Sequence, residues 1–260
     1  MKSQLYLNFD SKSSDVTKFE QQTSSLKPFL SFYGGKWREA KKYPKPLHDT
    51  IVEPFAGSAG YSVRYSHLNV ILCDADPIIA SIWQYLTRVS SAEILALPDI
   101  PDGADVNDIG VIQEAAWLIG FWLNAGVSQP RKTPSKWMRD NRNGSAFWGE
   151  RVRRRIAKQV NEIRHWKVYN CSYENCPDDV KATWFVDPPY QEQGRHYKYG
   201  SDDIDFNNLS NWCRSRIGQT IVCENEGANW LPFKYLYQTK STIGTRKSNE
   251  VMWTNTEMLG

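Results

Sequence analysis

The tetrapeptide Asp187-Pro188-Pro189-Tyr190 places a carboxylate, two prolines and an aromatic ring directly after the apolar run 182–186. We interpret the run as a buried strand and the tetrapeptide as the loop at its end. Proline lacks an N–H group and has a fixed φ, so the loop is stiff and leaves carbonyl groups to accept hydrogen bonds from another molecule. Asp187 and the Pro188 carbonyl are therefore candidate acceptors for the two hydrogens of a substrate amino group, and the Tyr190 ring is a candidate for stacking on the flat ring that carries it. The alternative is an ordinary exit from a strand into a turn.

A glycine-containing turn follows the predicted strand 50–55, and an acidic residue ends the next predicted strand, 70–74. A turn of small residues lets the backbone approach a ligand, and Asp74 lies about twenty residues further on, where nucleotide-binding sheets hold ribose hydroxyls. Glycine also serves tight turns for steric reasons alone, and Asp74 has the alternative of capping the next helix, a role for which Asp76 competes. The candidate cofactor residues of the turn are Glu53, Pro54, Phe55, Ala56, Gly57, Ser58 and Gly60.

The segment 29–36 joins aromatic rings, two glycines and a cation. Such a loop is suited to closing over an adenosine. Lys36 is not followed by Ser or Thr, so a triphosphate-binding loop is not indicated. A simple glycine hinge is the alternative. The candidate cofactor residues of this segment are Phe32, Tyr33, Gly34, Gly35 and Lys36.

Positive charge is concentrated between residues 131 and 167. This stretch has twelve basic and three acidic residues, a net charge of +9, whereas the whole chain has +3. A basic element on an otherwise acidic body is typical of a polyanion-binding protein, although a solvated helix face is the alternative. Aromatic residues such as Trp137 and Trp148 lie among these charges, which favours contacts with bases and sugars. The candidate nucleic-acid contacts are Arg131, Lys132, Lys136, Arg139, Arg142, Arg153 and Arg154.

The elements that must hold these loops alternate between strands and helices, which predicts an α/β fold. The block 109–166 has helical patterns and turn residues but no predicted strand, so we interpret it as an inserted, mainly helical recognition region. The sheet domain is then discontinuous and comprises residues 28–108 and 167–260. Residues 1–27 are polar and weakly patterned, and we expect a flexible arm. Further strands are predicted at 167–171, 182–186, 220–223, 233–240 and 250–254, and helices at 77–89, 109–124, 148–166 and 207–216.

The bulk composition narrows the class of protein. A chain of 260 residues can bury a substantial core. There is no apolar run of about 18 residues and no signal-peptide layout, so we expect a soluble, cytoplasmic protein with no membrane partner. The five cysteines include no Cys-x-x-Cys pair and the four histidines are scattered. We therefore predict plain thiols, with neither a disulfide framework nor a zinc site.

Taken in this order, the motifs resemble the Dam-type family of DNA adenine N6-methyltransferases, in which the target-recognition region lies between the cofactor motifs and the catalytic motif. The resemblance spans residues 29–254. The chain departs from the family at Ala59, where glycine is usual, and at Asp76, where asparagine is common. The similar segments are 32–36 for the amino-terminal motif, 53–60 for the glycine motif, 74–76 for the acidic motif and 187–190 for the catalytic motif. Residues 244–247, followed by Glu250, resemble a late loop of the family, and this loop adds Arg246 and Lys247 to the candidate DNA contacts.

The resemblance implies a Rossmann-like methyltransferase sheet, S-adenosylmethionine as the methyl donor and DNA as the partner, with no obligatory protein partner. It implies the cytoplasm of a bacterial or phage-infected cell. Asp74 and the adjoining Ala75 would hold the cofactor ribose, and Tyr173 would flank its adenine. Phe32 and Lys36 would enclose the other side of the cofactor.

The resemblance also implies a mechanism for the catalytic loop. Asp187 and the Pro188 carbonyl would each accept one amino hydrogen of an adenine that has left the duplex, and Tyr190 would stack on that base. The amino nitrogen would then attack the sulfonium methyl in line, with rate coming from positioning and preorganised acceptors. This chemistry requires no metal and no covalent enzyme intermediate.

Two alternatives remain for the function. One is the same amine chemistry on RNA or on a glutamine amide of a protein, and the basic block argues against the protein substrate. The other is a non-catalytic nucleic-acid-binding module of the same fold, against which the filled cofactor positions argue. The recognition segment is short and dominated by charge, so we hypothesise weak discrimination between base sequences, with phosphate contacts supplying most of the affinity.

Overall fold

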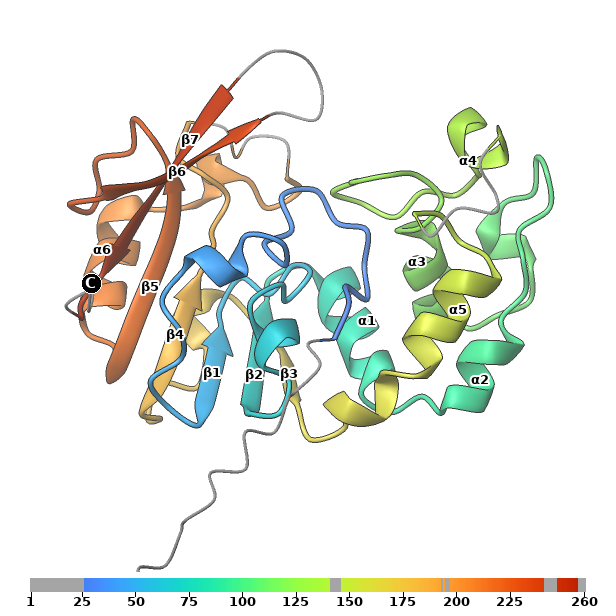
Figure 1. Cartoon of the computed structure of the whole chain (residues 1–260), viewed down its shortest axis with the longest axis horizontal. Coiled ribbons are helices and arrows are strands. Elements are labelled where there is room, and N and C mark those ends of the chain that lie inside the picture. Colours follow the sequence, from blue (N-terminus) through green and yellow to red (C-terminus); the bar gives the residue numbers. More distant parts are fainter. Residues whose placement is uncertain (1–25, 141–145, 193, 195–196, 241–246, 257–260) are drawn as a thin grey trace, which may run out of the picture.

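The computed structural model describes residues 26–140, 146–192, 194, 197–240 and 247–256. Within them, seven strands form one mixed sheet in the order β3-β2-β1-β4-β5-β7-β6 (Figure 1). The first five strands in that order are parallel, whereas β7 is antiparallel to both β5 and β6. The strands are β1 Thr50–Glu53, β2 Asn69–Asp74, β3 Lys167–Asn170, β4 Ala182–Val186, β5 Gly218–Asn225, β6 Lys234–Lys240 and β7 Lys247–Thr254.

The described part of the chain has six α-helices and several 3₁₀ turns. Polar side chains begin three of the helices: Asp76 accepts a hydrogen bond from the Ile78 amide, Ser90 forms a capping box with Glu93, and Asp205 caps the last helix. None of these helices is long and apolar enough to cross a membrane. The helices are α1 Pro77–Leu86, α2 Ser91–Ala96, α3 Gln113–Gly120, α4 Lys136–Asp140, α5 Glu150–Ala157 and α6 Phe206–Arg214, and the 3₁₀ turns are η1 Ala40–Lys42, η2 Ser62–Tyr65, η3 Val106–Asp108, η4 Val160–Ile163, η5 Tyr173–Asn175 and η7 Ser201–Asp203.

The chain reverses its direction across the sheet between β1 and β4. From β1 the chain adds β2 and then β3 on one side, whereas β4 lies on the other side of β1 and is followed by β5. In an open α/β sheet, ligands bind in the crevice outside the carboxyl ends of the strands at such a reversal. The loops after β1 and β4 carry the predicted glycine turn and Asp187, so the topology brings these two loops together.

Successive residues of the central strands alternate between two hydrophobic layers. Val52 and Trp184 pack in the layer that contains Leu209 of α6, whereas Ile51 and Phe185 pack in the larger layer on the other face. The alternation follows from the two-residue period of a strand. Both faces of the parallel strands are covered, which explains why β4 is buried at every position rather than at every second one.

Helices α2, α3, α4 and α5 lie together beyond α1, at the β3 end of the sheet (Figure 1). Leu118 of α3 and Ile156 of α5 belong to the same hydrophobic layer as Leu72 of β2. In the described residues, the block between α1 and β3 therefore shares one core with the sheet. Helix α2 begins at residue 91, before the start at 109 that the sequence predicts for the recognition region.

The predicted α/β class is confirmed, and each of the seven predicted strands is present within three residues of its expected ends. Two predicted helices are too long. The helix predicted at 109–124 ends at Gly120, whose carbonyl accepts a hydrogen bond of 3.0 Å from the Arg131 amide of the returning chain. The helix predicted at 148–166 divides into α5 and η4. Residues 1–25 of the predicted arm lie outside the described residues.

The prediction of plain thiols is wrong for two of the five cysteines. Cys73, in β2, and Cys176, which follows η5, form a disulfide with a Cα–Cα distance of 6.2 Å. The pair is separated by 103 residues along the chain and has no short-range spacing to reveal it. Parallel pairing of β2 with β3 brings the segment after β3 back to the end of β2, and that is where the two sulfurs meet.

Candidate active site

The predicted catalytic loop begins at the end of β4, beside the end of β1. Ile51 and Val52 of β1 are in register with Thr183 and Trp184 of β4. The side chain of Asp187 is not sealed in the core, because 21 % of it remains exposed. A carboxylate that can reach a bound ligand is the first requirement of the predicted amine chemistry.

Asp187 belongs to a cluster of charged and phenolic side chains. The Lys36 Nζ lies 3.1 Å from Asp187 Oδ1 and 3.4 Å from Glu250 Oε1. Glu250, a buried residue of β7, also accepts hydrogen bonds from the hydroxyls of Tyr190 and, at 3.0 Å, of Tyr43. One ammonium and two carboxylates give this cluster a net charge of −1. Sequence reasoning expects Lys36 to enclose a cofactor, and the structure brings its ammonium group to the Asp187 carboxylate.

Burial and these charges determine the protonation of the cluster. Burial acts to lower the pKa of Lys36, but the carboxylates of Asp187 and Glu250 outweigh it, so the pKa of Lys36 is raised and the side chain stays cationic. Burial raises the pKa of Asp187, and the nearby Lys36 ammonium opposes that shift. Lys36 therefore helps to keep Asp187 ionised, which is the state that accepts hydrogen bonds.

The other predicted catalytic residues are compatible with their expected roles. No backbone hydrogen bond from any described residue reaches the Pro188 carbonyl. Tyr190 is half-buried, and the Lys36 ammonium lies 4.7 Å from the centre of its ring. Pro189 packs against Gly194, where an added Cβ would lie 2.6 Å from the Pro189 carbonyl carbon. The loop is thus held by packing on one side and by the Glu250 hydrogen bond on the other.

Glu53, predicted to contact a cofactor, is buried beneath the glycine turn. Its Oε1 accepts a hydrogen bond of 2.6 Å from the amide of Ser62 at the start of η2. Burial raises the pKa of Glu53 to about 8, although the hydrogen bonds from Ser62 oppose the shift. Glu53 therefore fixes the end of the turn through the Ser62 amide.

The raised pKa of Glu53 predicts a pH-dependent stability. Between about pH 4.5 and about pH 8, the folded protein holds a proton that the unfolded chain releases, so the free energy of unfolding falls as pH rises, by at most about 1.4 kcal/mol per pH unit. Glu53→Gln removes this proton difference and keeps an oxygen for the Ser62 amide. We expect urea denaturation to show a smaller loss of stability between about pH 5 and about pH 8 in Glu53→Gln than in the wild type. The exposed Glu162→Gln serves as the control, and equal losses in Glu53→Gln and wild type would contradict the assignment.

Asp74 lies at the carboxyl end of β2, with its carboxylate held by the backbone. The amide of Gly57 donates to Oδ2 at 2.8 Å and the amide of Asp76 donates to Oδ1 at 2.9 Å. Burial raises the pKa of Asp74 to about 6, and both backbone hydrogen bonds oppose the shift. Asp76, rather than Asp74, caps α1. Each oxygen of Asp74 therefore retains a lone pair for a further donor such as a ribose hydroxyl.

The two glycine-containing segments pack on each other without space for side chains. A Cβ at Gly60 would lie 2.5 Å from the Trp37 amide nitrogen, and a Cβ at Gly35 would lie 2.8 Å from Ser58 Oγ. Gly34 has a φ of +72°, and a Cβ there would meet the Tyr197 hydroxyl at 2.7 Å. Glycine at these positions thus allows the loop 32–36 to approach the turn after β1, which places Lys36 near Asp187.

Aromatic rings lie on both sides of the glycine turn. Tyr173 of η5 stacks on Phe55 with a centroid distance of 5.5 Å. On the other side, Phe32 stacks on Tyr197 at 6.2 Å and its ring edge faces Gly57. The Asn170 side chain donates a hydrogen bond of 3.3 Å to the Ala75 carbonyl and so holds this residue in place. The exposed Tyr33 pairs through its amide with the Val127 carbonyl at 3.0 Å, which ties this loop to the helical region.

Sequence reasoning misses two buried carboxylates that support the site. Glu250 holds Lys36 and Tyr190, as described above. Glu224 of β5 accepts hydrogen bonds from the Gln191 amide at 2.7 Å and from Trp230 Nε1 at 3.2 Å, and burial raises its pKa to about 7. The available signal is a glutamate directly beside a run of apolar residues, 221–223 for Glu224 and 251–253 for Glu250, because a buried charge needs a partner. That signal identifies the glutamates but not the residues that they hold.

The predicted DNA contacts divide into exposed and structural residues. Arg154 is 67 % exposed and forms an ion pair of 2.6 Å with Glu150 on its own helix. Arg153 instead forms an ion pair with Asp99, and its side chain is only 13 % exposed. On α4, Lys136 pairs with Asp140 at 2.8 Å, Arg139 is exposed, and the side chain of Trp137 is 63 % exposed beside them. Arg142 and Arg246 lie outside the described residues, and for Lys247 only the backbone, at the start of β7, is described.

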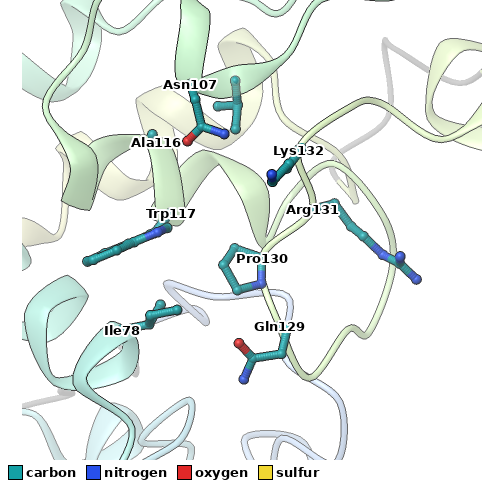
Figure 2. A pocket seen from close by; sticks show the side chains of 9 residues that line it. Ile78, Asn107, Ala116, Trp117, Gln129, Pro130, Arg131 and Lys132 are labelled. Carbon is teal, nitrogen blue, oxygen red and sulfur yellow. The ribbon is translucent and has the colours of Figure 1, made fainter. Parts of the chain in front are cut away.

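Arg131 and Lys132 border a cavity of about 190 Å³ at the junction of α1, η3 and α3 (Figure 2). Trp117 and Pro130 line it, and the Arg131 side chain extends away from both (Figure 2). The adjoining Gln129 donates to Asp76 Oδ2 at 2.9 Å. The loop that carries the two basic residues therefore contacts the acidic motif directly.

In comparisons with known proteins, no protein-family model and no curated protein sequence matches this chain.

Proposed function

We propose that the protein is an S-adenosylmethionine-dependent DNA adenine N6-methyltransferase. One observation carries this proposal. Strands β1 and β4 are neighbours at the point where the strand order reverses, so Asp187, which follows β4, and the glycine turn, which follows β1, leave the sheet side by side. The seven-stranded mixed sheet is compatible with the Rossmann-like methyltransferase sheet that the sequence resemblance implies. Asp74 lies beside that turn, bonded to the Gly57 amide. A candidate acceptor for an amino group and a candidate ribose site thus share one crevice.

The residues of the crevice fit a cationic nucleoside cofactor. Asp74 offers its remaining lone pairs to ribose hydroxyls, and Phe55 with Tyr173 forms an aromatic wall next to it. The cluster of Lys36, Asp187 and Glu250 has a net negative charge, which favours a neighbouring cation. S-adenosylmethionine, when bound, would supply a methyl group on a sulfonium centre.

The catalytic loop would act by orienting and polarising the target amino group. Asp187, ion-paired to Lys36 through one oxygen, keeps lone pairs for one amino hydrogen, and the Pro188 carbonyl accepts the other. Drawing on both hydrogens makes the nitrogen lone pair available for in-line attack on the methyl carbon. The proton released after transfer has an acceptor in the Asp187 carboxylate. Tyr190 stacks on the flipped base, which costs a few kcal/mol to unstack.

A nucleic acid is the substrate that best fits the surface of the helical region. The exposed Arg139 and Trp137 lie on α4, which is at the top of the helical group in Figure 1, the side toward which β1 and β4 point. Basic groups for phosphates and an exposed ring for bases suit a nucleic acid more than a protein amide.

Sequencing that detects methylated bases tests the proposed function directly. A plasmid lacking adenine methylation is incubated with the protein and S-adenosylmethionine, and we expect N6-methyladenine at many sites that share at most a short motif. A single strict motif of four or more bases would contradict weak discrimination. Methylation of RNA but not of DNA would show that the protein is an RNA methyltransferase, which is the first alternative. Failure to bind S-adenosylmethionine in calorimetry, together with retained DNA binding, would favour the non-catalytic module.

Arg154 is expected to contribute to DNA affinity through a phosphate. We expect Arg154→Ala to weaken DNA binding and to reduce the slope of log K against log salt concentration by about 1. Fluorescence anisotropy at several salt concentrations measures both. Arg214→Ala is the matched control, because Arg214 is exposed on α6 at the other end of the sheet (Figure 1). An unchanged slope for Arg154→Ala would show that its ion pair with Glu150 is its only role.

A further inference from the structure

Three cysteine sulfurs converge at the edge of the candidate cofactor site. The Sγ atoms of Cys73, Cys171 and Cys176 all lie within 4.8 Å of one another. Cys73 and Cys176 are buried and joined in a disulfide, whereas Cys171 is a half-buried free thiol. A free thiol next to a disulfide is the arrangement required for thiol–disulfide exchange.

We propose that these three cysteines form a redox-reactive site in which Cys171 is the entry point for small thiols and disulfides. In the internal step, the Cys171 thiolate attacks the Cys176 sulfur, the Cys171–Cys176 bond forms as the Cys73–Cys176 bond breaks, and the electron pair stays on Cys73, which then takes up a proton. No external oxidant is consumed, because one disulfide replaces another. Cys171 is the most accessible of the three, so an external disulfide such as glutathione disulfide reacts there, leaving a mixed disulfide and one free glutathione thiol.

The site is coupled to the cofactor crevice through the backbone. The Ala56 amide of the glycine turn donates to the Cys73 carbonyl at 2.9 Å, and the Cys171 amide donates to the Asp74 carbonyl at 3.1 Å. Tyr173, which stacks on Phe55, is one of the four residues between Cys171 and Cys176. The disulfide therefore ties the segment that carries Tyr173 to the end of β2, and opening it releases that covalent tie.

The rate of exchange is limited by the ionisation of Cys171. Burial, together with the Asp74 carboxylate, raises the pKa of the Cys171 thiol, and the thiolate is the attacking species. The free cysteines Cys213 and Cys223 are buried and do not belong to the group of three sulfurs, so they serve as internal references.

Peptide mapping of the full-length protein tests the site. The non-reduced protein is incubated at about pH 8.5, near the pKa of an ordinary thiol, and is then quenched with acid and alkylated. We expect the Cys73–Cys176 bridge together with a fraction bridged through Cys171, and a mixed disulfide at Cys171 after addition of glutathione disulfide. In Cys171→Ser only the Cys73–Cys176 bridge remains, and Cys213→Ser behaves as the wild type. Three results overturn the proposal. They are alkylation of all five cysteines without reductant, the absence of any disulfide that includes Cys171, and a zinc ion retained by the three cysteines.

The link to cofactor binding rests on the proposed function and has its own readout. We expect calorimetry to give about tenfold weaker S-adenosylmethionine binding after reduction of the wild type, equal to about 1.4 kcal/mol. In the double variant Cys73→Ala, Cys176→Ala the affinity is weak with and without reductant. Equal affinities of the oxidised and reduced wild type overturn the link. If neither form binds S-adenosylmethionine, the proposed function fails, whereas peptide mapping still decides the redox chemistry.

Discussion

Asp187→Ala is expected to lower the rate constant of methyl transfer by at least about a hundredfold while leaving DNA affinity within about twofold of the wild type. The reason is that, in the proposed mechanism, Asp187 supplies one of two preorganised acceptors for the target amino group, and removal of one such group typically costs about 10²–10³ in rate. Its position at the end of β4, outside the basic helical region, predicts little effect on phosphate contacts. Single-turnover kinetics with saturating DNA measures the chemical step without product release.

Two controls separate chemistry from folding in this experiment. Asp203→Asn changes an exposed carboxylate of η7 and should retain wild-type rates. Asp187→Asn keeps the size of the side chain but presents an amide to Lys36, so we expect it to be nearly as inactive as Asp187→Ala. If Asp187→Ala melts like the wild type and methylates DNA within about threefold of the wild-type rate, Asp187 is not required for methyl transfer and the proposed mechanism is wrong.

Lys36→Met is expected to reduce activity and to move the acid limb of its pH profile to higher pH. Burial raises the pKa of Asp187, and Lys36 opposes that shift. Without the ammonium, the pKa of Asp187 rises further, so at a given pH less of the protein has the ionised acceptor. The activity is present above that pKa and is lost as pH falls through it. The profile of kcat/KM against pH reports this displacement, because it follows the protonation of the free enzyme.

The same substitution should also lower stability, because Glu250 and Asp187 lose their shared cation. Removing one partner of a buried pair costs about 3–5 kcal/mol when the remaining charge stays ionised. We therefore expect a lower Tm for Lys36→Met, with a deficit that shrinks as pH falls and Asp187, whose pKa is raised by burial, takes up a proton. Lys36→Arg keeps the charge and should keep the acid limb near that of the wild type. The exposed Lys41→Met is the matched control, and an unmoved acid limb in Lys36→Met would show that Lys36 does not act on Asp187.

Local patterns in the chain were sufficient to predict the strands of the sheet. The run 182–186 is buried at each position because β4 is covered on both faces, and a short, mainly apolar run that ends in prolines is typical of a buried strand. The ends of the helices were less predictable. Helix α3 stops at Gly120 because the chain returns and the Arg131 amide takes its carbonyl, which is a contact between residues eleven apart that no helical pattern records.

The loops of the candidate site could be predicted from the sequence, because the types and order of residues such as Asp74 and Asp187 are set along the chain and their strands end where the apolar runs end. The contacts of Lys36 with Asp187 and Glu250, and the disulfide between Cys73 and Cys176, became known only from the folded structure. These contacts depend on the order of strands in the sheet, with β7 inserted beside β5 and β3 placed beyond β2. Strand order results from the packing of the whole core, and residues far apart in the chain carry no local signal of the partner they will meet.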